Sequence, residues 1–188
     1  MSRPFPPVDE LGRVLGQRPH PPVEDVNVMA AVIACLHEDA VLLVLRSQHP
    51  EDPWSGHVGL PGGRHEQEDG TLLSTALREA REEVGFDPLD HGRLLGPLGT
   101  YTGRGRRVTG VRIGVFVAAL EQRPQLALSH EVASAHWIPL DHLVPGEAPV
   151  PEYPDGTVPA YTPEVAGGHR LTVWGITYGI LEQLRAVE

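Results

Sequence analysis

Residues 72–85 form the part of the sequence that most restricts how this chain can fold. One side of this segment is apolar at the spacing of an α-helix, with Leu72, Leu73, Ala76, Leu77, Ala80 and Val84, and Gly85 stands where such a helix is expected to end. Glu79, Glu82 and Glu83 share one side of the helix, because residues three and four apart are neighbours on a helix. The pattern therefore predicts an amphipathic helix with three carboxylates crowded on one side.

The segments on both sides of this helix have the composition of β-strands. Short apolar runs bounded by turn residues predict strands, and apolar positions at a period of 3.6 predict a helix. The predicted elements are a hairpin of strands at 28–36 and 40–46, two strands at 93–103 and 108–120 joined by an Arg-rich turn, a short strand and helix at 136–143, and an amphipathic C-terminal helix at 174–187. Such a mixture predicts an α+β or α/β fold.

The length of 188 residues suits one domain. Residues 1–25 are rich in Pro and predict an irregular arm, with a short helix near Asp9 to Leu15, in front of a domain spanning 26–188. Residues 144–170, rich in Pro and Gly, predict a long loop or excursion. Because the sequence has neither an apolar run of the roughly 18 residues that span a membrane nor an apolar N-terminal segment typical of secretion, we expect a cytoplasmic protein.

Charge and composition exclude several classes of function. The net charge of −10 argues against general binding to nucleic acid or to an anionic membrane. It does not exclude a phosphate substrate, since a divalent cation inverts the local charge of a site. All 15 basic residues are Arg, so covalent Lys chemistry is excluded. The single cysteine, Cys35, allows no internal disulfide or cysteine-based zinc cluster, and we interpret it as a core residue.

The three glutamates allow two interpretations. A solvated acidic helix face is the common one. The other is a cation site, because like charges four residues apart destabilise a helix and hard oxygen ligands select Mg²⁺ or Mn²⁺. The Pro61-Gly62-Gly63 turn in front of the helix would bring main chain close to the carboxylates, and together with Gly85 it favours the cation site.

This combination resembles a known family. The segment Arg78-Glu79-Ala80-Arg81-Glu82-Glu83-Val84-Gly85-Phe86, placed after a Pro-Gly-Gly turn, is similar to the Nudix box. The resemblance extends from about Val28 to the segment Trp137–Leu140. It implies an α/β/α sandwich with a mixed sheet, and Mg²⁺- or Mn²⁺-dependent hydrolysis of a pyrophosphate bond in a small nucleotide-derived substrate. The fold is commonly dimeric, so the resemblance also leaves a homodimer open.

The spacing in front of the box resembles one branch of the family, the coenzyme A pyrophosphatases. The general Nudix pattern places an acidic residue where this chain has Gly70. Asp69 and Glu66 are therefore the candidates for the role of this acid. The branch has the same spacing between two acids and the box as this chain has between Glu66, Asp69 and Ala76-Leu77-Arg78-Glu79-Ala80. It also has segments similar to Leu45-Arg46-Ser47 and Trp174-Gly175-Ile176-Thr177. The branch has an Arg and a His upstream where this chain has Asp52-Pro53-Trp54-Ser55-Gly56-His57.

The resemblance implies roles for individual residues. Glu79 and Glu83 are the expected metal ligands, followed by Glu82 and the Gly63 carbonyl. Arg78 would orient carboxylates through a bidentate pair, and Gly62 and Gly85 would shape the turn and the helix end. The general base stays open among Glu82, Glu66 and Glu131. The candidates for phosphate contact are Arg46 and the hairpin-tip residues Arg104, Arg106 and Arg107, and weaker candidates for substrate contact are His57, Trp54, Tyr101, Tyr153 and Tyr161.

Three functional hypotheses remain open from the sequence. The first is a pyrophosphatase for coenzyme A or a derivative. The second is a Nudix hydrolase for ADP-ribose, a dinucleoside polyphosphate or a modified nucleoside triphosphate. The third is a non-catalytic Nudix module that senses a nucleotide. Such modules usually lose a glutamate of the box, and because all three are present here the pattern favours an enzyme.

Overall fold

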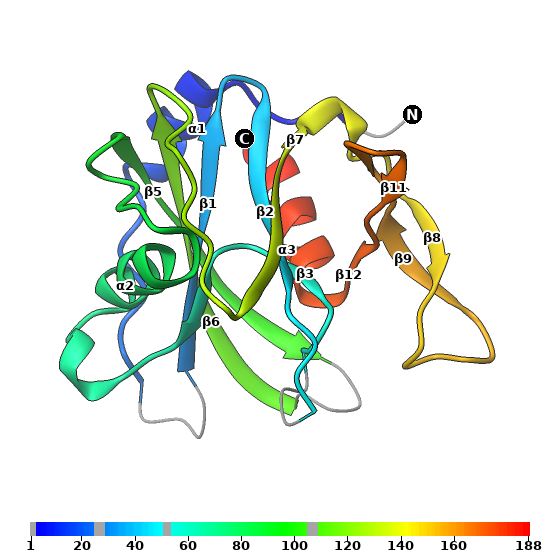
Figure 1. Cartoon of the computed structure of the whole chain (residues 1–188). Coiled ribbons are helices and arrows are strands. Elements are labelled where there is room, and N and C mark those ends of the chain that lie inside the picture. Colours follow the sequence, from blue (N-terminus) through cyan, green and yellow to red (C-terminus); the bar gives the residue numbers. More distant parts are fainter. Residues whose placement is uncertain (1–2, 25–28, 51–53, 105–108) are drawn as a thin grey trace.

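A mixed sheet forms the centre of the computed structural model, which describes residues 3–24, 29–50, 54–104 and 109–188 (Figure 1). Its strands are β1 (Met29–His37), β2 (Ala40–Arg46), β3 (Val58–Gly59), β4 (Gly62–Arg64), β5 (Gly92–Arg104), β6 (Thr109–Leu120) and β7 (Val132–Pro139). The strand order is β3-β2-β1-β6-β5, with β4 also paired to β1 and β7 to β2. β1 runs parallel to β6, and the other pairs are antiparallel.

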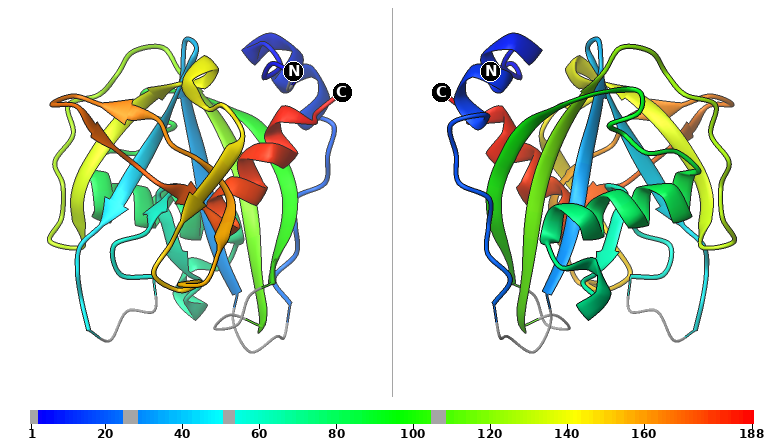
Figure 2. Two further views of the ribbon diagram at one scale, coloured as in Figure 1. Left: turned by 90° about the vertical axis from the view of Figure 1, so that its right-hand side faces the viewer. Right: turned by 90° about the vertical axis from the view of Figure 1, so that its left-hand side faces the viewer.

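Helices cover both faces of this sheet (Figures 1 and 2). On one face, Ile33 and Cys35 of β1 belong to a core cluster with Ala76 and Ala80 of α2 (Leu72–Val84). On the other face, α1 (Val8–Leu15) and α3 (Gly175–Arg185) contribute Leu11, Leu15, Ile180 and Leu184 to a second cluster that includes Ala34 and Leu36 of β1. A strand buried on both sides is apolar throughout, which explains the continuous run of β1. The predicted α/β/α sandwich is confirmed.

The two ends of the described chain lie side by side (Figure 2). Arg185 of α3 donates from Nη1 to the Arg3 carbonyl at 2.7 Å, and its guanidinium lies 4.1 Å from the ring centre of Phe5. The expected short N-terminal helix is present as α1 and packs on β5, where a Cβ at Gly96 would come within 2.3 Å of the Leu15 carbonyl. The N-terminal arm is thus packed on the rest of the chain. Among the described residues, no helix is long and apolar enough to cross a membrane.

The segment 144–170, expected to be a long loop or excursion, is not an irregular loop. This segment contains β8 (Gly146–Pro149), β9 (Thr157–Tyr161), β10 (Glu164–Val165) and β11 (His169–Arg170), with β12 (Val173–Trp174) just after it. β8, β9 and β12 form a small second sheet, and β10 pairs with β11. These strands are two to five residues long and include Pro149 and Pro159, so they lack the alternation that marks a strand in sequence. β3 and β4 are equally short and were not expected either. β7 begins at Val132, four residues before the predicted position 136.

Candidate active site

Helix α2 begins and ends as its sequence predicts. Thr71 caps the N-terminus by accepting a hydrogen bond from the Ser74 amide at 3.1 Å. Gly85 ends the helix in the left-handed conformation, with φ of 82°, and a Cβ there would also come within 2.6 Å of the Ala127 side chain. Ala76, Ala80 and Val84 are buried against the sheet, and Glu83 is buried beside them at the edge of this contact.

The Pro-Gly-Gly turn brings main chain against these carboxylates. Gly62 has φ of 151° and pairs with Val32 of β1, and a Cβ at this position would lie 2.3 Å from the Ala31 carbonyl. At Gly63 a Cβ would lie 2.5 Å from the carboxyl carbon of Glu79. Gly62 therefore requires glycine for its backbone conformation and its close contact with β1, and a side chain at Gly63 would have to displace the Glu79 carboxylate.

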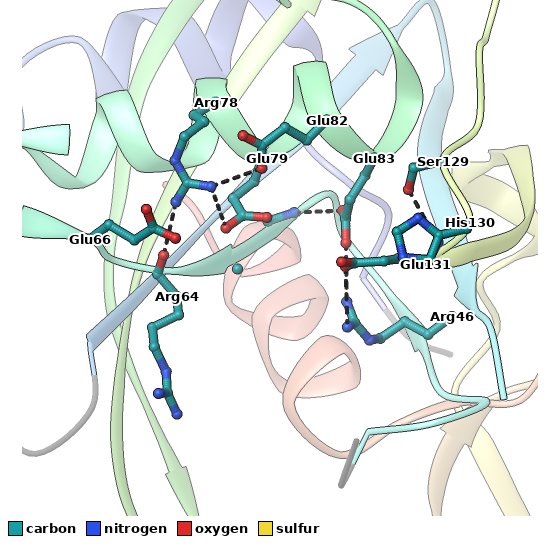
Figure 3. A pocket seen from close by; sticks show the side chains of 12 residues that line it. Arg46, Arg64, Glu66, Arg78, Glu79, Glu82, Glu83, Ser129, His130 and Glu131 are labelled. Atoms are coloured by element: carbon teal, nitrogen blue, oxygen red, sulfur yellow. Dashed lines mark hydrogen bonds and ion pairs between the residues drawn. The ribbon is translucent and has the colours of Figure 1, made fainter. Parts of the chain in front are cut away.

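A cavity of about 470 Å³ lies between α2, β4, the end of β2 and the loop before β7 (Figure 3). The structure brings together nearly all of the predicted site residues here. Those that line the cavity are Arg46, Gly62, Gly63, Glu66, Arg78, Glu79, Glu82, Glu83 and Glu131, joined by Arg64, Ser129 and His130. The cavity wall is thus rich in carboxylates contributed by three separate segments of the chain.

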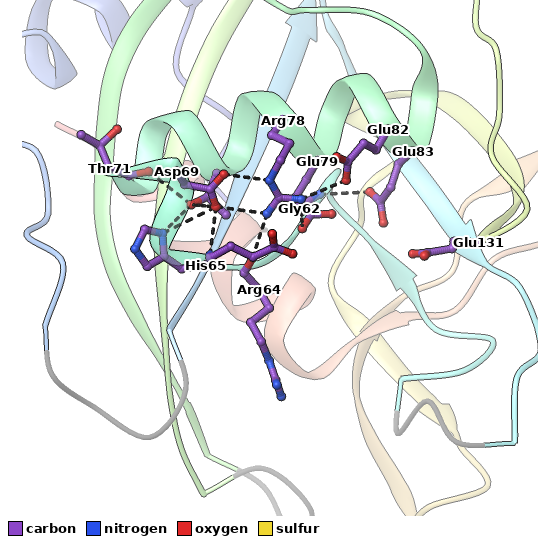
Figure 4. Close-up of polar contacts among 12 residues, drawn as sticks. Gly62, Arg64, His65, Asp69, Thr71, Arg78, Glu79, Glu82, Glu83 and Glu131 are labelled. Carbon is purple, nitrogen blue, oxygen red and sulfur yellow. Dashed lines mark hydrogen bonds and ion pairs between the residues drawn. The ribbon is translucent and has the colours of Figure 1, made fainter.

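Arg78 is the centre of a polar network at one end of the cavity (Figure 4). It donates to both oxygens of Asp69, from Nε at 2.8 Å and from Nη2 at 3.1 Å, and from Nη2 to the Arg64 carbonyl at 3.0 Å. Its Nη1 lies 2.9 Å from a carboxylate oxygen of Glu79 and from one of Glu82. Arg78 therefore has the geometry to orient two of the three box glutamates.

Asp69 pairs with Arg78, whereas Glu66 does not. This pairing favours Asp69 as the acid that the general Nudix pattern places at position 70. Besides the two bonds from Arg78, Asp69 Oδ2 accepts from the Glu66 amide at 3.0 Å and from Thr75 Oγ1 at 2.9 Å. The bonds from Arg78 outweigh desolvation and hold the pKa of Asp69 well below its usual value. Glu66 is exposed and lines the cavity with its side chain.

Glu83 stands at the other end of the cavity and is the most buried of the box glutamates, with 3% of its side chain exposed. Its Oε1 accepts from Arg46 Nη1 at 3.0 Å and its Oε2 from the Gly62 amide at 3.0 Å. Burial raises its pKa to about 7, an effect that the Gly62 amide and Arg46 only partly oppose. Glu131 lies on the far side of Arg46, with an oxygen 4.0 Å from Nη2.

The donor set fits a hard divalent cation. Burial also raises the pKa of Glu79 despite its contact with Arg78, so both Glu79 and Glu83 are carboxylates whose charged forms a bound cation would stabilise. Carboxylate and carbonyl oxygens are the ligands that Mg²⁺ and Mn²⁺ prefer. In the described part of the chain, no three His, Cys, Asp or Glu side chains already converge as a metal site. The carboxylates would thus have to adjust when a cation binds.

The weaker sequence candidates lie elsewhere. His57 pairs with Glu152 at 2.9 Å and packs on Trp174, with ring centres 5.0 Å apart. Tyr161 is fully buried and bonds Glu182, and the Tyr101 ring packs where α3 has Gly179. Arg106 and Arg107 lie outside the described residues, as does the side chain of Arg104. The structure therefore gives no support to a substrate role for His57, Tyr101 or Tyr161.

Sequence reasoning missed Thr75 and His65. Thr75 is fully buried, and its hydroxyl lies 2.7 Å from His65 Nδ1 in addition to its bond to Asp69. The available signal was a polar residue on the apolar side of α2, four residues before Glu79. Since a buried hydroxyl needs a hydrogen-bond partner, Thr75 pointed to an acceptor in the preceding loop.

The NUDIX domain family matches residues 27–158, which include the whole cavity wall. The chain belongs to the NUDIX family. A peroxisomal coenzyme A diphosphatase, ndx-8 of Caenorhabditis elegans, is 37% identical to this Nudix chain in an alignment of 147 residues that covers 72% of the chain and 59% of the worm protein. The uncharacterized Nudix hydrolase NudL of Pectobacterium atrosepticum is 29% identical over 167 residues, covering 87% of this chain and 83% of that protein.

Solved structures agree with the Nudix fold. A MutT/nudix family protein from Enterococcus faecalis superimposes with a TM-score of 0.56 at 18% identity, over 90% of this chain and 64% of that one. A MutT NUDIX hydrolase from Burkholderia pseudomallei gives a TM-score of 0.54 at 19% identity, over 88% of this chain and 98% of that one. At these identities the likeness establishes the fold alone.

Proposed function

We propose that this protein is a divalent-cation-dependent pyrophosphohydrolase that cleaves coenzyme A or a derivative at its diphosphate linkage. The main support is the placement of Glu79 and Glu83, two carboxylates with raised pKa, on the wall of one cavity beside Gly63. The worm relative, named a coenzyme A diphosphatase, and the matching length of the segment from Glu66 to Ala80 support the choice of substrate.

Glu79 and Glu83, with Glu82 and the Gly63 carbonyl in support, are the groups that would hold the cation. When bound, a divalent cation neutralises diphosphate oxygens and lowers the pKa of water. Hydrolysis then forms a bond from a water oxygen to one phosphorus and breaks that phosphorus's bond to the bridging oxygen, which gives two phosphate monoesters. The chain's own task is to position the diphosphate and to accept a proton from water.

Among the three candidate bases, Glu131 is the one that we propose. Glu82 is held by Arg78 at 2.9 Å, and Glu66 lies next to Asp69, which accepts a hydrogen bond from the Glu66 amide. The Glu131 side chain is 53% exposed and faces the cavity opposite α2, next to Arg46 (Figure 3). A base has to be free to reach water, and Glu131 meets this condition at the same end as Glu83. Arg46 is the proposed phosphate contact, because a guanidinium matches phosphate oxygens.

One observation favours a second substrate class. The segment upstream of the box has Asp52-Pro53-Trp54 where the coenzyme A branch has an Arg and a His. The alternative is therefore a hydrolase for ADP-ribose, a dinucleoside polyphosphate or a modified nucleoside triphosphate. A non-catalytic sensing module has less support, since Glu79, Glu82 and Glu83 are all present and all line the cavity.

A hydrolysis screen with and without Mg²⁺ or Mn²⁺ tests this proposal. We expect cation-dependent release of 4′-phosphopantetheine from coenzyme A, faster than release of AMP from ADP-ribose. Glu83→Gln is expected to lower kcat by about 10³-fold, because several kcal/mol of charge stabilisation at the transition state depend on the cation. Glu68→Gln is the matched control: it removes an exposed glutamate that does not line the cavity, and it should keep the wild-type rate.

The outcomes separate the hypotheses. Turnover that persists in Glu83→Gln, or that needs no cation, contradicts the mechanism. Faster turnover of ADP-ribose or of a dinucleoside polyphosphate selects the second substrate class. Nucleotide binding without turnover of any diphosphate selects the sensing module.

A further inference from the structure

Both carboxylate oxygens of Glu83 accept a hydrogen bond within the protein. Oε1 accepts from Arg46 and Oε2 accepts from the Gly62 amide, each at 3.0 Å. With 3% of its side chain exposed, Glu83 has almost no contact with water that could make room for a ligand. A cation that binds Glu83 therefore has to share an oxygen with one of these donors or replace it.

Arg46 is the donor that can leave. The Gly62 amide is fixed, because Gly62 pairs with Val32 in the central sheet and tolerates no side chain there. Arg46 is the last residue of β2, and 25% of its side chain is exposed, so its guanidinium can rotate about a long flexible stem. A second carboxylate, Glu131, lies 4.0 Å from Arg46 Nη2 on the open side of the cavity.

We propose that Arg46 occupies the cation's place at Glu83 until a divalent cation binds, and that the cation then releases Arg46 to contact the substrate diphosphate. The proposal rests on the proposed function, which it extends from the identity of the site to its order of assembly. A guanidinium beside a divalent cation would experience repulsion between like charges, so the two cannot share Glu83 without cost. The released Arg46 has Glu131 and then the diphosphate as partners on the open side.

This arrangement makes the ion pair and the cation competitors. By thermodynamic linkage, a group that competes with a ligand weakens the binding of that ligand, and removing the group strengthens it. Arg46 should therefore have opposite effects on two measured quantities. It should weaken cation binding to the substrate-free protein and strengthen binding of the diphosphate substrate.

The test measures Mn²⁺ binding to the substrate-free protein by electron paramagnetic resonance, for the wild type, Arg46→Gln and Arg46→Lys. Because Arg46 helps to keep Glu83 ionised, the titrations are run near pH 9, above the Glu83 pKa of about 7, so that a proton does not replace the arginine. We expect Arg46→Gln to bind Mn²⁺ about three- to fivefold more tightly, the range of a partly exposed ion pair. Arg46→Lys, which keeps a charge, should bind as the wild type does.

Arg64→Gln is the matched control. Arg64 also lines the cavity and its loss removes the same charge, but its side chain extends away from Glu83 (Figure 3). Its Mn²⁺ affinity should change less than twofold. An equal gain in Arg64→Gln and Arg46→Gln would show a general effect of net charge and overturn the proposal.

Three further results complete the test. Unchanged or weaker Mn²⁺ binding in Arg46→Gln, in a wild type that binds Mn²⁺, refutes the competition and leaves the proposed function intact. A wild type that binds no Mn²⁺ refutes the proposed function itself. If Arg46→Gln does not fold, nitrogen NMR of the wild-type guanidinium decides: Mg²⁺ should shift the Arg46 signal, and a signal that Mg²⁺ leaves unmoved overturns the proposal.

Discussion

At each end of the cavity a buried carboxylate pairs with an arginine of the cavity wall, and the two carboxylates behave in opposite ways. Asp69 and Glu83 have 5% and 3% of their side chains exposed, and each is bonded to an arginine. Yet the pKa of Asp69 is well below its usual value, whereas the pKa of Glu83 is raised to about 7. Burial alone therefore does not determine the sign of the shift.

Hydrogen bonds from Arg78 dominate at Asp69, whereas desolvation dominates at Glu83. The nearby carboxylates Glu79 and Glu131 raise the pKa of Glu83 further. Asp69 accepts four hydrogen bonds, two from Arg78, one from the Glu66 amide and one from Thr75. Glu83 accepts two, from Arg46 and from Gly62. A carboxylate saturated with donors is stable as an anion, whereas one with few donors retains a desolvation cost. The Asp69 end thus suits a permanent structural ion pair, and the Glu83 end suits a partner that can be exchanged.

Asp69→Asn tests the structural end and should produce the largest change in stability. It leaves Arg78 facing an uncharged partner, so we expect the free energy of unfolding at pH 7 to fall by about 3 kcal/mol. Since the pKa of Asp69 is lowered by folding, its contribution is present above its unfolded pKa of 3.8 and is lost as pH falls below that value. Urea unfolding of the chelator-treated protein measures the change.

Glu82→Gln is the control for that measurement. Glu82 bonds the same Arg78 at 2.9 Å, but 57% of its side chain is exposed. An exposed pair contributes less than about 1 kcal/mol. Equal losses in the two variants would mean that Asp69 is not the anchor of Arg78, and the contrast between the ends of the cavity would fail.

The raised pKa of Glu83 predicts that the free energy of unfolding depends on pH in the opposite direction. Folded Glu83 keeps its proton up to about pH 7, whereas its ordinary pKa is 4.5, so the folded state binds more protons in this interval. The free energy of unfolding should therefore decrease as pH rises from 4.5 to about 7 because of this group, by on the order of 2 kcal/mol, and stay level above it.

The difference between the wild type and Glu83→Gln isolates this contribution, because all other groups titrate in both proteins. Urea unfolding in chelator, at steps from pH 4 to pH 9, should show Glu83→Gln gaining on the wild type through the interval. A constant difference between the two proteins would mean that Glu83 titrates normally, and that its two donors suffice to offset its burial.

The sequence was sufficient to predict the local part of the site. Helical spacing alone placed Glu79, Glu82 and Glu83 on one side of α2, and all three line the cavity. The end of the helix at Gly85 followed from its need for a left-handed conformation. Contacts within one helical turn depend only on spacing along the chain, so they can be predicted from the sequence.

Contacts between segments far apart in the chain could not be predicted from the sequence. Nothing in the spacing could decide between Asp69 and Glu66, because the choice depends on how the loop in front of α2 turns back toward Arg78. The pair of Arg46 with Glu83 joins residues 37 positions apart and depends on how β2 pairs with β1, the strand on which α2 packs. The strands at 144–170 depend on pairing with one another and with β12, which short segments with Pro do not reveal.

Thr75 tests how the structural end is held together, with the smallest expected effect. Thr75→Val keeps the shape of a fully buried side chain but removes one of the four donors to Asp69, so we expect a loss of about 1 kcal/mol in unfolding free energy. The pKa of Asp69, followed by the NMR shift of its carboxyl carbon, should rise toward its usual value. Thr75→Ser retains the hydroxyl and should restore the low pKa. If the Asp69 pKa is the same in Thr75→Val and Thr75→Ser, Arg78 alone fixes the charge of Asp69, and the count of donors does not explain why the two ends differ.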